Sequence, residues 1–349
     1  MDMPKSQRFH KRLRGRVDMT HGAGGKAMAN LIHDLFSRAF DNEWLAQGND
    51  FALLDLPPGR PVMTTDSYVV SPLFFPGGDI GKLAVHGTVN DLAMAGAEPL
   101  YLSAGFILEE GLPFADLERI VLSMAEAAHE AGVCIVTGDT KVVERGKGDG
   151  VFINTAGLGV VPDWVEVAPS GDAARPGDRV LVSGTVGDHG ICILGTREGL
   201  RFESDVQSDT APLNGLVAAM TIIEPDLRVL RDPTRGGLAT TLNEIAHQSR
   251  CGIRIREDAV RVKPAVAAAC ELLGIDPLYA ANEGKLVAIC APEDAEELLH
   301  VMRQHPRGRD ATIIGEVVEA EHPFVELETT FGGRRLLDWL TGEQLPRIC

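Results

Sequence analysis

The most constraining feature of this 349-residue sequence is an alternation between two apolar periodicities. In the first half, apolar residues at every second position predict strands, and those at every third or fourth position predict helices. The predicted strands are 61–65, 101–108, 133–139 and 151–161, and the predicted helices are 79–96 and 114–132. Strands that alternate with helices are typical of the α/β (α+β) class. A single small stapled scaffold is excluded.

The same alternation begins again after 167–178, a segment rich in Pro, Gly, Ser and Asp that indicates a turn-rich connection. The predicted strands beyond it are 179–184, 285–290 and 311–318, and the predicted helices are 187–196, 212–222, 237–248, 264–273 and 292–304. The sequence therefore predicts one domain over 1–170, a second over 171–330 and a tail over 331–349. The tail has one weak helical stretch, RRLLDWL, and little apolar surface to anchor it, so we expect it to be mobile.

Charge and cysteine usage narrow the function classes. The net charge of −17 disfavours nucleic acid and anionic membranes as partners, and a short basic block reads as a solvated N-terminal segment (Lys5, Arg8, Lys11, Arg12, Arg14 and Arg16). There is no membrane-length apolar run and no signal-peptide core, so a cytoplasmic location is expected. Six scattered cysteines without a CxxC pair indicate reduced thiols. Five of them are expected to be buried, whereas Cys349 is the last residue.

Three aspartates follow strand- or helix-like segments beside small or hydroxyl residues: Asp66 in MTTDS, Asp91 in NDLAMAGAEP and Asp139 in TGDTKVV. Each alone is most often a turn former or a helix cap. Together they can supply the carboxylates that hold Mg²⁺ with a nucleotide. Lys141 lies two residues after Asp139, so on an extended strand both face the same side, where the lysine could neutralise a phosphate. The alternative is an ordinary surface lysine.

Glycine-rich turns lead into several predicted helices. Gly24 and Gly25 precede one over 28–36, where backbone N–H groups could meet an anion. Two later turns, SGTVGDHG and DPTRGGL, offer His189 and Arg235 as anion contacts, although helix capping alone explains much of both. Glu283, in a predicted turn, is either a solvated carboxylate or a general base beside a cleft.

Taken in order, MTTDS, NDLAMAGAEP, TGDTKVV, SGTVGDHG, DPTRGGL, NEG and the terminal PRIC resemble the HypE family of hydrogenase maturation proteins. That family belongs to the aminoimidazole-ribonucleotide-synthetase-like (PurM-like) superfamily of ATP-using enzymes. The resemblance implies a two-domain PurM-like fold, with an N-terminal α/β domain that forms a homodimer, a mixed α/β C-terminal domain and a flexible tail. It also implies that ATP and Mg²⁺ bind near the interface between the halves.

The resemblance implies a reaction as well. A carbamoyl group delivered by the carbamoyltransferase HypF is carried on Cys349, ATP drives its dehydration to a thiocyanate, and the cyanide passes to iron on the HypC–HypD scaffold. Lys141 and Glu283 would share the acid–base work, in an order left open. The implied metal and ATP positions are Asp66, Asp91 and Asp139, and the implied nucleotide contacts include Asn90, Gly24 and Gly25.

Four other functions are alternatives to this one. Three belong to related enzymes, and the fourth is that of a non-catalytic protein. Aminoimidazole-ribonucleotide synthetase and thiamine-monophosphate kinase would use a similar ATP site but give no role to Cys349. Selenophosphate synthetase usually has a reactive Cys or selenocysteine near its N-terminal Gly loop, whereas the first cysteine here is Cys134. A non-catalytic scaffold for metallocentre assembly would use the terminal cysteine only to dock partners.

Overall fold

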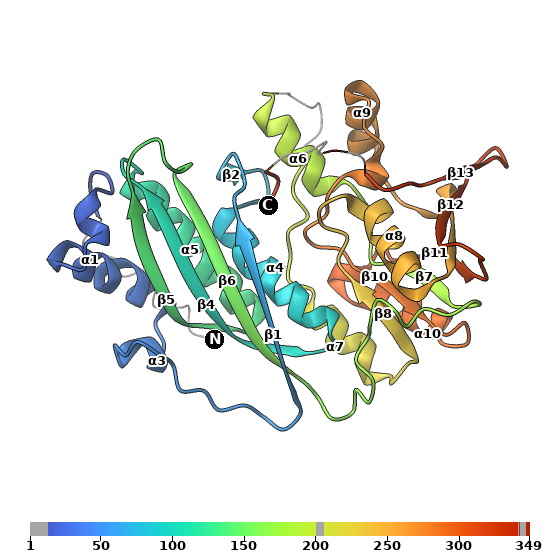
Figure 1. The fold of residues 1–349 in the computed structure, drawn as a ribbon, viewed down its shortest axis with the longest axis horizontal. Coiled ribbons are helices and arrows are strands. Elements are labelled where there is room, and N and C mark those ends of the chain that lie inside the picture. The colour runs from blue at the N-terminus through green and yellow to red at the C-terminus, as the bar shows by residue number, and fades with distance from the viewer. Residues whose placement is uncertain (1–12, 200–205, 341, 343–346) are drawn as a thin grey trace.

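A computed structural model of the chain describes residues 13–199, 206–340, 342 and 347–349 (Figure 1). Most of the basic N-terminal block lies outside the described residues. The described chain is a mixed α/β protein with two main sheets, which confirms the predicted fold class. It passes from the first sheet to the second between Val161 and Arg179.

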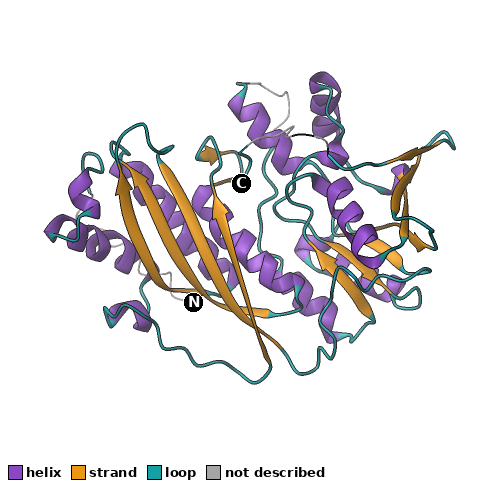
Figure 2. Cartoon of the chain, in the orientation of Figure 1, coloured by secondary structure: helices purple, strands orange, loops and turns teal. Residues whose placement is uncertain are grey.

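The first sheet has four strands in the order β1-β6-β4-β5 and is covered by helices on one face only (Figure 2). Its strands are β1 (Arg60–Tyr68), β4 (Glu98–Glu109), β5 (Cys134–Val143) and β6 (Val151–Val161), and its covering helices are α4 (Ile80–Met94) and α5 (Phe114–Ala131). Apolar side chains such as Leu83, Ile120 and Leu102 fill the space between the helices and the sheet. No helix of the described ranges covers the other face of the sheet, its open face.

Short elements surround this sheet. The N-terminal ones are η2 (Met19–Gly22), α1 (Lys26–Leu31), the π-helical η3 (Ile32–Phe36), α2 (Ser37–Phe40) and α3 (Glu43–Ala46), and a hairpin joins β2 (Phe74–Phe75) to β3 (Gly78–Asp79). Asp79 begins α4 because its carboxylate accepts the N–H groups of Gly81 and Lys82. Gly81 lets α4 approach α5 closely, since a Cβ there would lie 2.5 Å from the Ile120 carbonyl oxygen.

The second sheet has seven strands in the order β13-β12-β9-β11-β7-β10-β8 and carries helices on both faces. Its strands are β7 (Arg179–Val182), β8 (Leu227–Arg231), β9 (Gly252–Arg256), β10 (Val287–Cys290), β11 (Thr312–Val318), β12 (Phe324–Glu328) and β13 (Arg334–Leu336). Helix α8 (Gly237–Ser249) packs on one face, and α7 (Asn214–Ile222) and α10 (Ala295–Gln304) pack on the other. The remaining elements are α6 (Asp188–Arg197), α9 (Pro264–Leu273), η4 (Glu257–Ala259), η5 (Pro277–Tyr279) and η6 (Pro306–Gly308).

The two halves share apolar cores. Ala93 and Met94, at the end of α4, pack with α7 and α10 of the second half. Ile191 and Ile193 of α6 belong to the same cluster as the core of the first sheet. Helix α4 therefore lies between the two sheets and brings its C-terminal residues to the cleft that separates them.

Two predictions about the tail are wrong for its described part. RRLLDWL is not helical, because β13 pairs antiparallel with β12 and Leu337 donates its N–H to the Val325 carbonyl oxygen. The tail is also not left without an anchor, since Leu337 and Ile348 are both buried. Edge-strand pairing and two apolar side chains supply anchorage that the sparse apolar pattern did not reveal.

Candidate functional site

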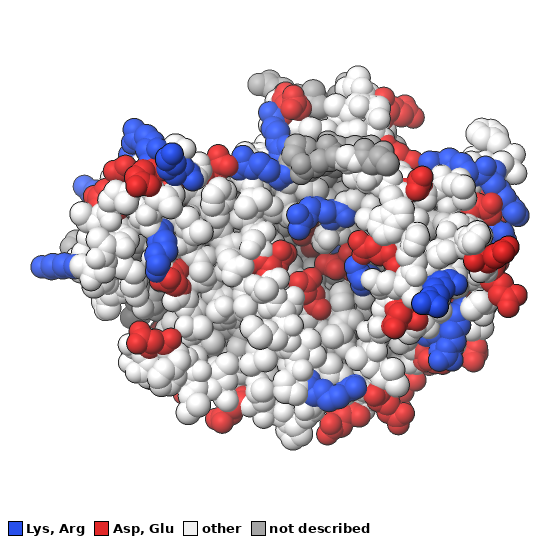
Figure 3. Space-filling model, in the orientation of Figure 1, with Lys and Arg blue, Asp and Glu red and all other residues white. Residues whose placement is uncertain are grey.

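Four carboxylates from four different segments gather in the cleft between the halves. Asp66 lies on β1, Asp91 on α4, Asp232 directly after β8, and Glu283 in the loop before β10. Burial, followed by the nearby Asp232 and Asp66 carboxylates, raises the pKa of Asp91 to about 7. In the space-filling view, acidic side chains colour the hollow at the centre of the molecule (Figure 3).

Asp91 and Asp66 each accept a hydrogen bond from a residue of the first domain. The Thr64 hydroxyl donates to Asp91 Oδ2 at 3.0 Å, so neighbouring positions on β1 and α4 are tied together. Asp66 Oδ1 accepts the backbone N–H of Ser67 at 2.7 Å. Both carboxylates keep oxygen lone pairs that these bonds do not use.

Glu283 is held through its backbone, while one oxygen of its carboxyl has no hydrogen-bond partner in the described part of the chain. Its N–H donates to Asp209 Oδ1 at 3.1 Å, and Asp209 also pairs with the Lys285 ammonium at 2.9 Å. A Cβ on Gly284 would lie 1.9 Å from the Asp209 carbonyl oxygen, so glycine is required there. Glu283 Oε1 is buried and makes no hydrogen bond within the described part of the chain.

Burial, then the Asp232 and Asp209 carboxylates, raises the pKa of Glu283 well above its ordinary value. A carboxylate destabilised in this way binds a proton more strongly than a solvated one. The electrostatics of the cleft therefore suit Glu283 to accept a proton.

Asn90, expected among the nucleotide contacts, has a different role. Its side-chain amide donates to the carbonyl oxygens of Ala211 and Glu283, at 3.0 and 3.4 Å, and its Oδ1 accepts the N–H of Leu213 at 2.8 Å. The side chain is buried and fully engaged with protein. Asn90 thus fixes the Glu283 loop against α4 instead of facing a ligand.

The end of the chain lies in the same cleft. Val69 donates its N–H to the Cys349 carbonyl oxygen at 3.0 Å, and Ser71 donates to the Arg347 carbonyl oxygen at 3.2 Å. Burial, followed by the Glu283 carboxylate, raises the pKa of the Cys349 thiol to about 12, with Asp66 and Asp232 adding to the effect and Arg235 opposing it. The terminal cysteine is therefore placed among the cleft carboxylates.

Asp139 does not join this cluster within one chain. It lies on β5 in register with Gly105 of β4, which is in register with Asn154 of β6 and so with Ser67 of β1. Three strand spacings, or about 14 Å along the sheet, separate Asp139 from β1. The expected metal group of Asp66, Asp91 and Asp139 is therefore wrong for a single chain, because β1 and β5 are opposite edges of the sheet.

Asp139 and Lys141 form an ion pair on the open face of the sheet, where both are more than half exposed. The hydrogen bond from Lys141 is the main cause that lowers the pKa of Asp139. The Gly24–Gly25 turn is near this edge, because it follows Gly22, where an added Cβ would lie 2.8 Å from the backbone nitrogen of Val142 on β5. An apolar pocket of about 110 Å³ lies alongside, between the N-terminal helices and β5, with Phe36, Phe40 and Ile135 in its walls.

Asp232 is the residue that sequence reasoning missed. It opens the DPTRGGL motif, from which only Arg235 was selected as a candidate. Like Asp66 and Asp91, it offers carboxylate oxygens, the ligand type that Mg²⁺ prefers. Within the described residues, no three His, Cys, Asp or Glu side chains are already arranged as a metal-binding group. Besides burial, the Asp232 carboxylate raises the pKa of Asp91, so the two charges lie near each other in the cleft.

The two residues predicted to contact an anion, Arg235 and His189, have different surroundings. Arg235 is exposed and lies close enough to Cys349 to affect its pKa. His189 is fully buried, and its Nε2 lies 2.6 Å from the Ile348 carbonyl oxygen, so it contacts the tail instead of an anion. Among the cysteines, Cys134 is only partly buried, which corrects the expectation for that residue.

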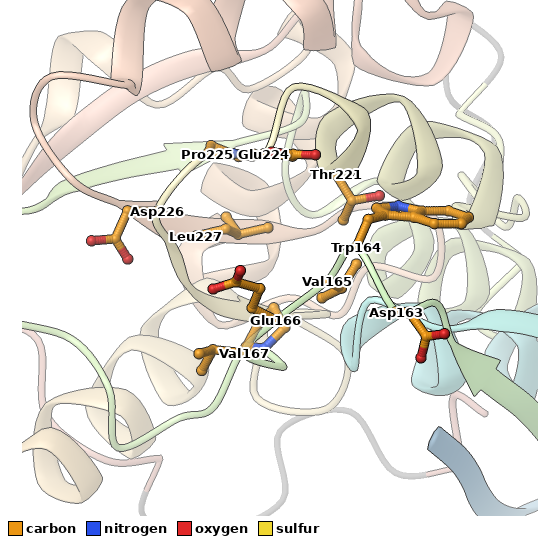
Figure 4. Close-up of a pocket in the computed structure, with 11 residues that line it drawn as sticks. Asp163, Trp164, Val165, Glu166, Val167, Thr221, Glu224, Pro225, Asp226 and Leu227 are labelled. Carbon is orange, nitrogen blue, oxygen red and sulfur yellow. The ribbon is translucent and has the colours of Figure 1, made fainter. Parts of the chain in front are cut away.

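A larger cavity, of about 450 Å³, lies away from these residues (Figure 4). Its walls are the connection between the domains, which includes Trp164 and Glu166, and the turn between α7 and β8, which includes Glu224 and Asp226. No predicted site residue lines it. Most of the side chains predicted to carry the chemistry therefore lie in the central cleft, and none lies in this cavity.

The fold agrees with comparisons to known proteins. Residues 48–161 match the N-terminal domain of AIR synthase related proteins, and residues 175–328 match the C-terminal domain of the same family. Together the matches span most of the chain, so it is a two-domain protein of the AIR synthase related class. No helix in the described ranges is both long and apolar enough to cross a bilayer.

Relatives that match over nearly the full length show which family of this class the chain belongs to. The chain is 66% identical to carbamoyl dehydratase HypE of Azotobacter vinelandii over 335 residues, covering 96% of this chain and 98% of that one. A crystal structure of the hydrogenase maturation protein HypE in complex with ATP matches with a TM-score of 0.92 and 56% identity, over 95% of this chain and 99% of that one. A HypE–HypF complex matches with a TM-score of 0.78 and 52% identity, over 89% and 99%. The chain belongs to the HypE family of carbamoyl dehydratases.

Proposed function

We propose that this protein converts a carbamoyl group on the sulfur of Cys349 into a cyano group at the expense of ATP. The cyanide would serve as a ligand of the iron in [NiFe]-hydrogenases. The observation that carries the proposal is the position of Cys349, which is hydrogen-bonded to Val69 just after β1. There burial, and then the Glu283, Asp66 and Asp232 carboxylates, raise the pKa of its thiol. A carrier residue placed inside the acidic cleft brings its cargo to the groups that act on it.

The chemistry requires activation of a poor leaving group. The carbamoyl oxygen of Cys349–S–C(=O)–NH₂ takes the γ-phosphoryl group of ATP, and ADP leaves. Loss of the N–H protons and cleavage of the C–O bond then give Cys349–S–C≡N and inorganic phosphate. The oxygen atom of the thiocarbamate therefore ends in the phosphate, and its two N–H hydrogens leave as protons.

Glu283 is the base in this scheme. Its carboxyl has a raised pKa and an oxygen without a partner in the described structure, so it can accept a proton from the carbamoyl nitrogen. Lys141 supplies positive charge to the phosphoryl group being transferred. This assignment orders the two residues whose acid–base roles the sequence left open.

Asp66, Asp91 and Asp232 would hold Mg²⁺. A bound Mg²⁺ supplies positive charge to the phosphate oxygens of the nucleotide. The three side chains come from both domains, so the cleft must be assembled before they can act together.

A second copy of the chain would complete the site. Asp139, Lys141 and the Gly24–Gly25 turn lie at the β5 edge, whereas the acidic cluster lies beyond the β1 edge. The open face between them is largely uncharged (Figure 3), and it exposes 74% of Met63 and 43% of Ile107. A homodimer packed through this face would bring the β5 edge of one protomer to the β1 edge of its partner and bury those side chains.

The proposed partners follow from what the tail must do. In the docked position Cys349 is largely enclosed, so the tail must leave the cleft to receive its carbamoyl group. We infer that a HypF carbamoyltransferase loads it, which the solved HypE–HypF complex of relatives supports. The cyanide would then pass to iron on a HypC–HypD scaffold, in the cytoplasm, where the six cysteines remain reduced.

An isotope experiment tests the proposed chemistry. The protein is loaded with a carbamoyl group that carries ¹⁸O, ATP is added for one turnover, and the released phosphate is analysed by mass spectrometry. We expect one ¹⁸O atom in the phosphate, because the carbamoyl oxygen leaves bonded to phosphorus. Unlabelled phosphate would show that the oxygen departs by another route and would contradict the scheme.

A further inference from the structure

Three consecutive backbone carbonyl oxygens at the chain end each meet a donor. The Arg347 oxygen accepts from Ser71 N–H and from Arg197 Nη2 at 2.8 Å, the Ile348 oxygen from the His189 ring at 2.6 Å, and the Cys349 oxygen from Val69 N–H. These donors come from the segment after β1 and from α6, so both domains hold the tail. The side chains of this segment are engaged as well, since Ile348 is buried and Arg347 pairs with Asp149 at 2.6 Å.

The hydrogen bonds of His189 define its tautomer. A carbonyl oxygen can only accept, so Nε2 carries the proton toward Ile348, and Nδ1 accepts from the Ser208 hydroxyl at 2.8 Å. Burial is the main cause that lowers the pKa of His189, so the ring is neutral and this single arrangement is kept. Ser208 is oriented in turn, because its oxygen accepts the N–H of Thr210 at 3.1 Å.

We propose that His189 and Arg197 of α6 are positioning residues that fix the register of the chain end in the cleft. The tail runs beside residues 69–71 like an added strand. In such a pairing, a slip of one residue moves each side chain by about 3.3 Å and turns it to the opposite face. The bond from His189 to Ile348 lies between the two outer bonds and excludes that slip, so Cys349 stays opposite Val69.

Recognition through backbone atoms suits a carrier whose side chain changes. The bonds to residues 347–349 do not involve Sγ, so they persist whether the sulfur carries hydrogen, a carbamoyl group or a cyano group. The buried Ile348 side chain supplies the specificity for this chain end. This inference rests on the proposed function for its catalytic consequence, but its structural part can be measured without any turnover.

Thiol accessibility tests the structural part. The full-length His189→Leu, His189→Gln and Arg197→Met variants are treated with N-ethylmaleimide, and modification of Cys349 and Cys134 is followed by peptide mass spectrometry. In His189→Leu and Arg197→Met, Cys349 should react about tenfold faster than in the wild type, the factor that loss of one buried hydrogen bond gives. His189→Gln keeps an N–H donor and should restore most of the protection, and Cys134 should keep its wild-type rate in every variant.

The outcomes are distinct. An unchanged Cys349 rate in both His189→Leu and Arg197→Met would overturn the proposal. If His189→Leu accelerates Cys134 as well, it has lost its fold, and Arg197→Met then decides alone. Failure of the wild type to convert a loaded carbamoyl group would overturn the proposed function and leave the accessibility result standing. If both hold, single-turnover dehydration should slow in the same variants with little change in the KM for ATP.

Discussion

Glu283 illustrates how a single residue's backbone and side chain can serve opposite purposes. The backbone is fixed by Asp209 and Asn90, whereas the carboxyl is buried near like charges without a hydrogen-bond partner for Oε1 in the described chain. Such an arrangement costs stability and is found where a group is kept ready for chemistry. The sequence identified Glu283 as a loop carboxylate but could not show its burial, which depends on segments more than 70 residues away.

Glu283→Gln is the residue-scale prediction. The amide keeps the shape and removes a carboxyl that burial and the nearby Asp232 make costly to ionise, so the variant should unfold at or above the wild-type temperature. It should still bind ATP but dehydrate the loaded carbamoyl group about 100-fold more slowly or worse, because the base is lost. Calorimetry and single-turnover mass spectrometry measure the two effects. Dehydration at the wild-type rate would remove Glu283 from the mechanism.

At the scale of elements, long periodic segments were predicted well, whereas short ones were predicted unevenly: the four-residue strands β7 and β10 lie within predicted strands, but other short strands were missed. Helices α4 and α5 were expected over 79–96 and 114–132 and lie at Ile80–Met94 and Phe114–Ala131. Strands β8, β9 and β12 were missed, because charged residues interrupt their short apolar runs, LRVLR, GIRIR and FVELE. RRLLDWL was assigned to a helix because its leucines fit that spacing, whereas pairing with β12 decides its conformation.

The loop that carries Glu283 depends on the buried ion pair between Asp209 and Lys285. Asp209→Asn or Lys285→Met alone leaves one charge buried and unpaired and should lower the free energy of unfolding by about 3–5 kcal/mol. The double variant removes both charges and should regain much of that loss. Urea unfolding of the four proteins measures the coupling, and equal, additive losses would show that the pair does not hold the loop.

The same pair gives a pH dependence of defined sign. Burial alone would raise the pKa of Asp209, but the Lys285 ammonium holds it below its ordinary value. A depressed folded-state pKa contributes stability above the unfolded-state pKa, near 3.9, and loses that contribution as the pH falls through the folded-state value. The difference in stability between wild type and Asp209→Asn should therefore be present at pH 7 and shrink below about pH 4.

For the whole molecule, the sequence could not show which copy of the chain supplies which residue. Asp139 and Lys141 follow a strand exit just as Asp66 does, so all three were expected in one group. The strand order β1-β6-β4-β5 places them at opposite edges, and strand order is not encoded in any local pattern. Asp232 was missed for the same reason, since only the packing of the second domain against α4 brings it to Asp91.

A composite site predicts complementation between inactive subunits. Asp91→Asn and Lys141→Ala homodimers should both be inactive in ATP turnover. Mixed by unfolding and refolding in equal amounts, they should recover about a quarter of the wild-type rate, because half of the dimers are hybrids and each hybrid has one intact site. No recovery would place both residues in the same chain's site.

The dimer surface itself can be tested with a matched pair of substitutions. Met63→Lys puts a charge on the open sheet face and should yield monomers in sedimentation experiments, with loss of ATP turnover. Leu272→Lys is the control, since Leu272 is equally exposed, at 76%, but lies on α9. A dimeric, active Met63→Lys protein would exclude this face as the interface.

The carrier role of Cys349 is tested most directly by intact-protein mass spectrometry. The wild type, incubated with the carbamoyltransferase and its substrates, should gain about 43 Da for a carbamoyl group, and after ATP the gain should fall to about 25 Da for a cyano group, because the sulfur is the nucleophile that holds both. Cys349→Ala should bind ATP, unfold like the wild type and gain neither mass. Modification of Cys349→Ala, or a cyano group mapped to any of the other five cysteines, would contradict the account.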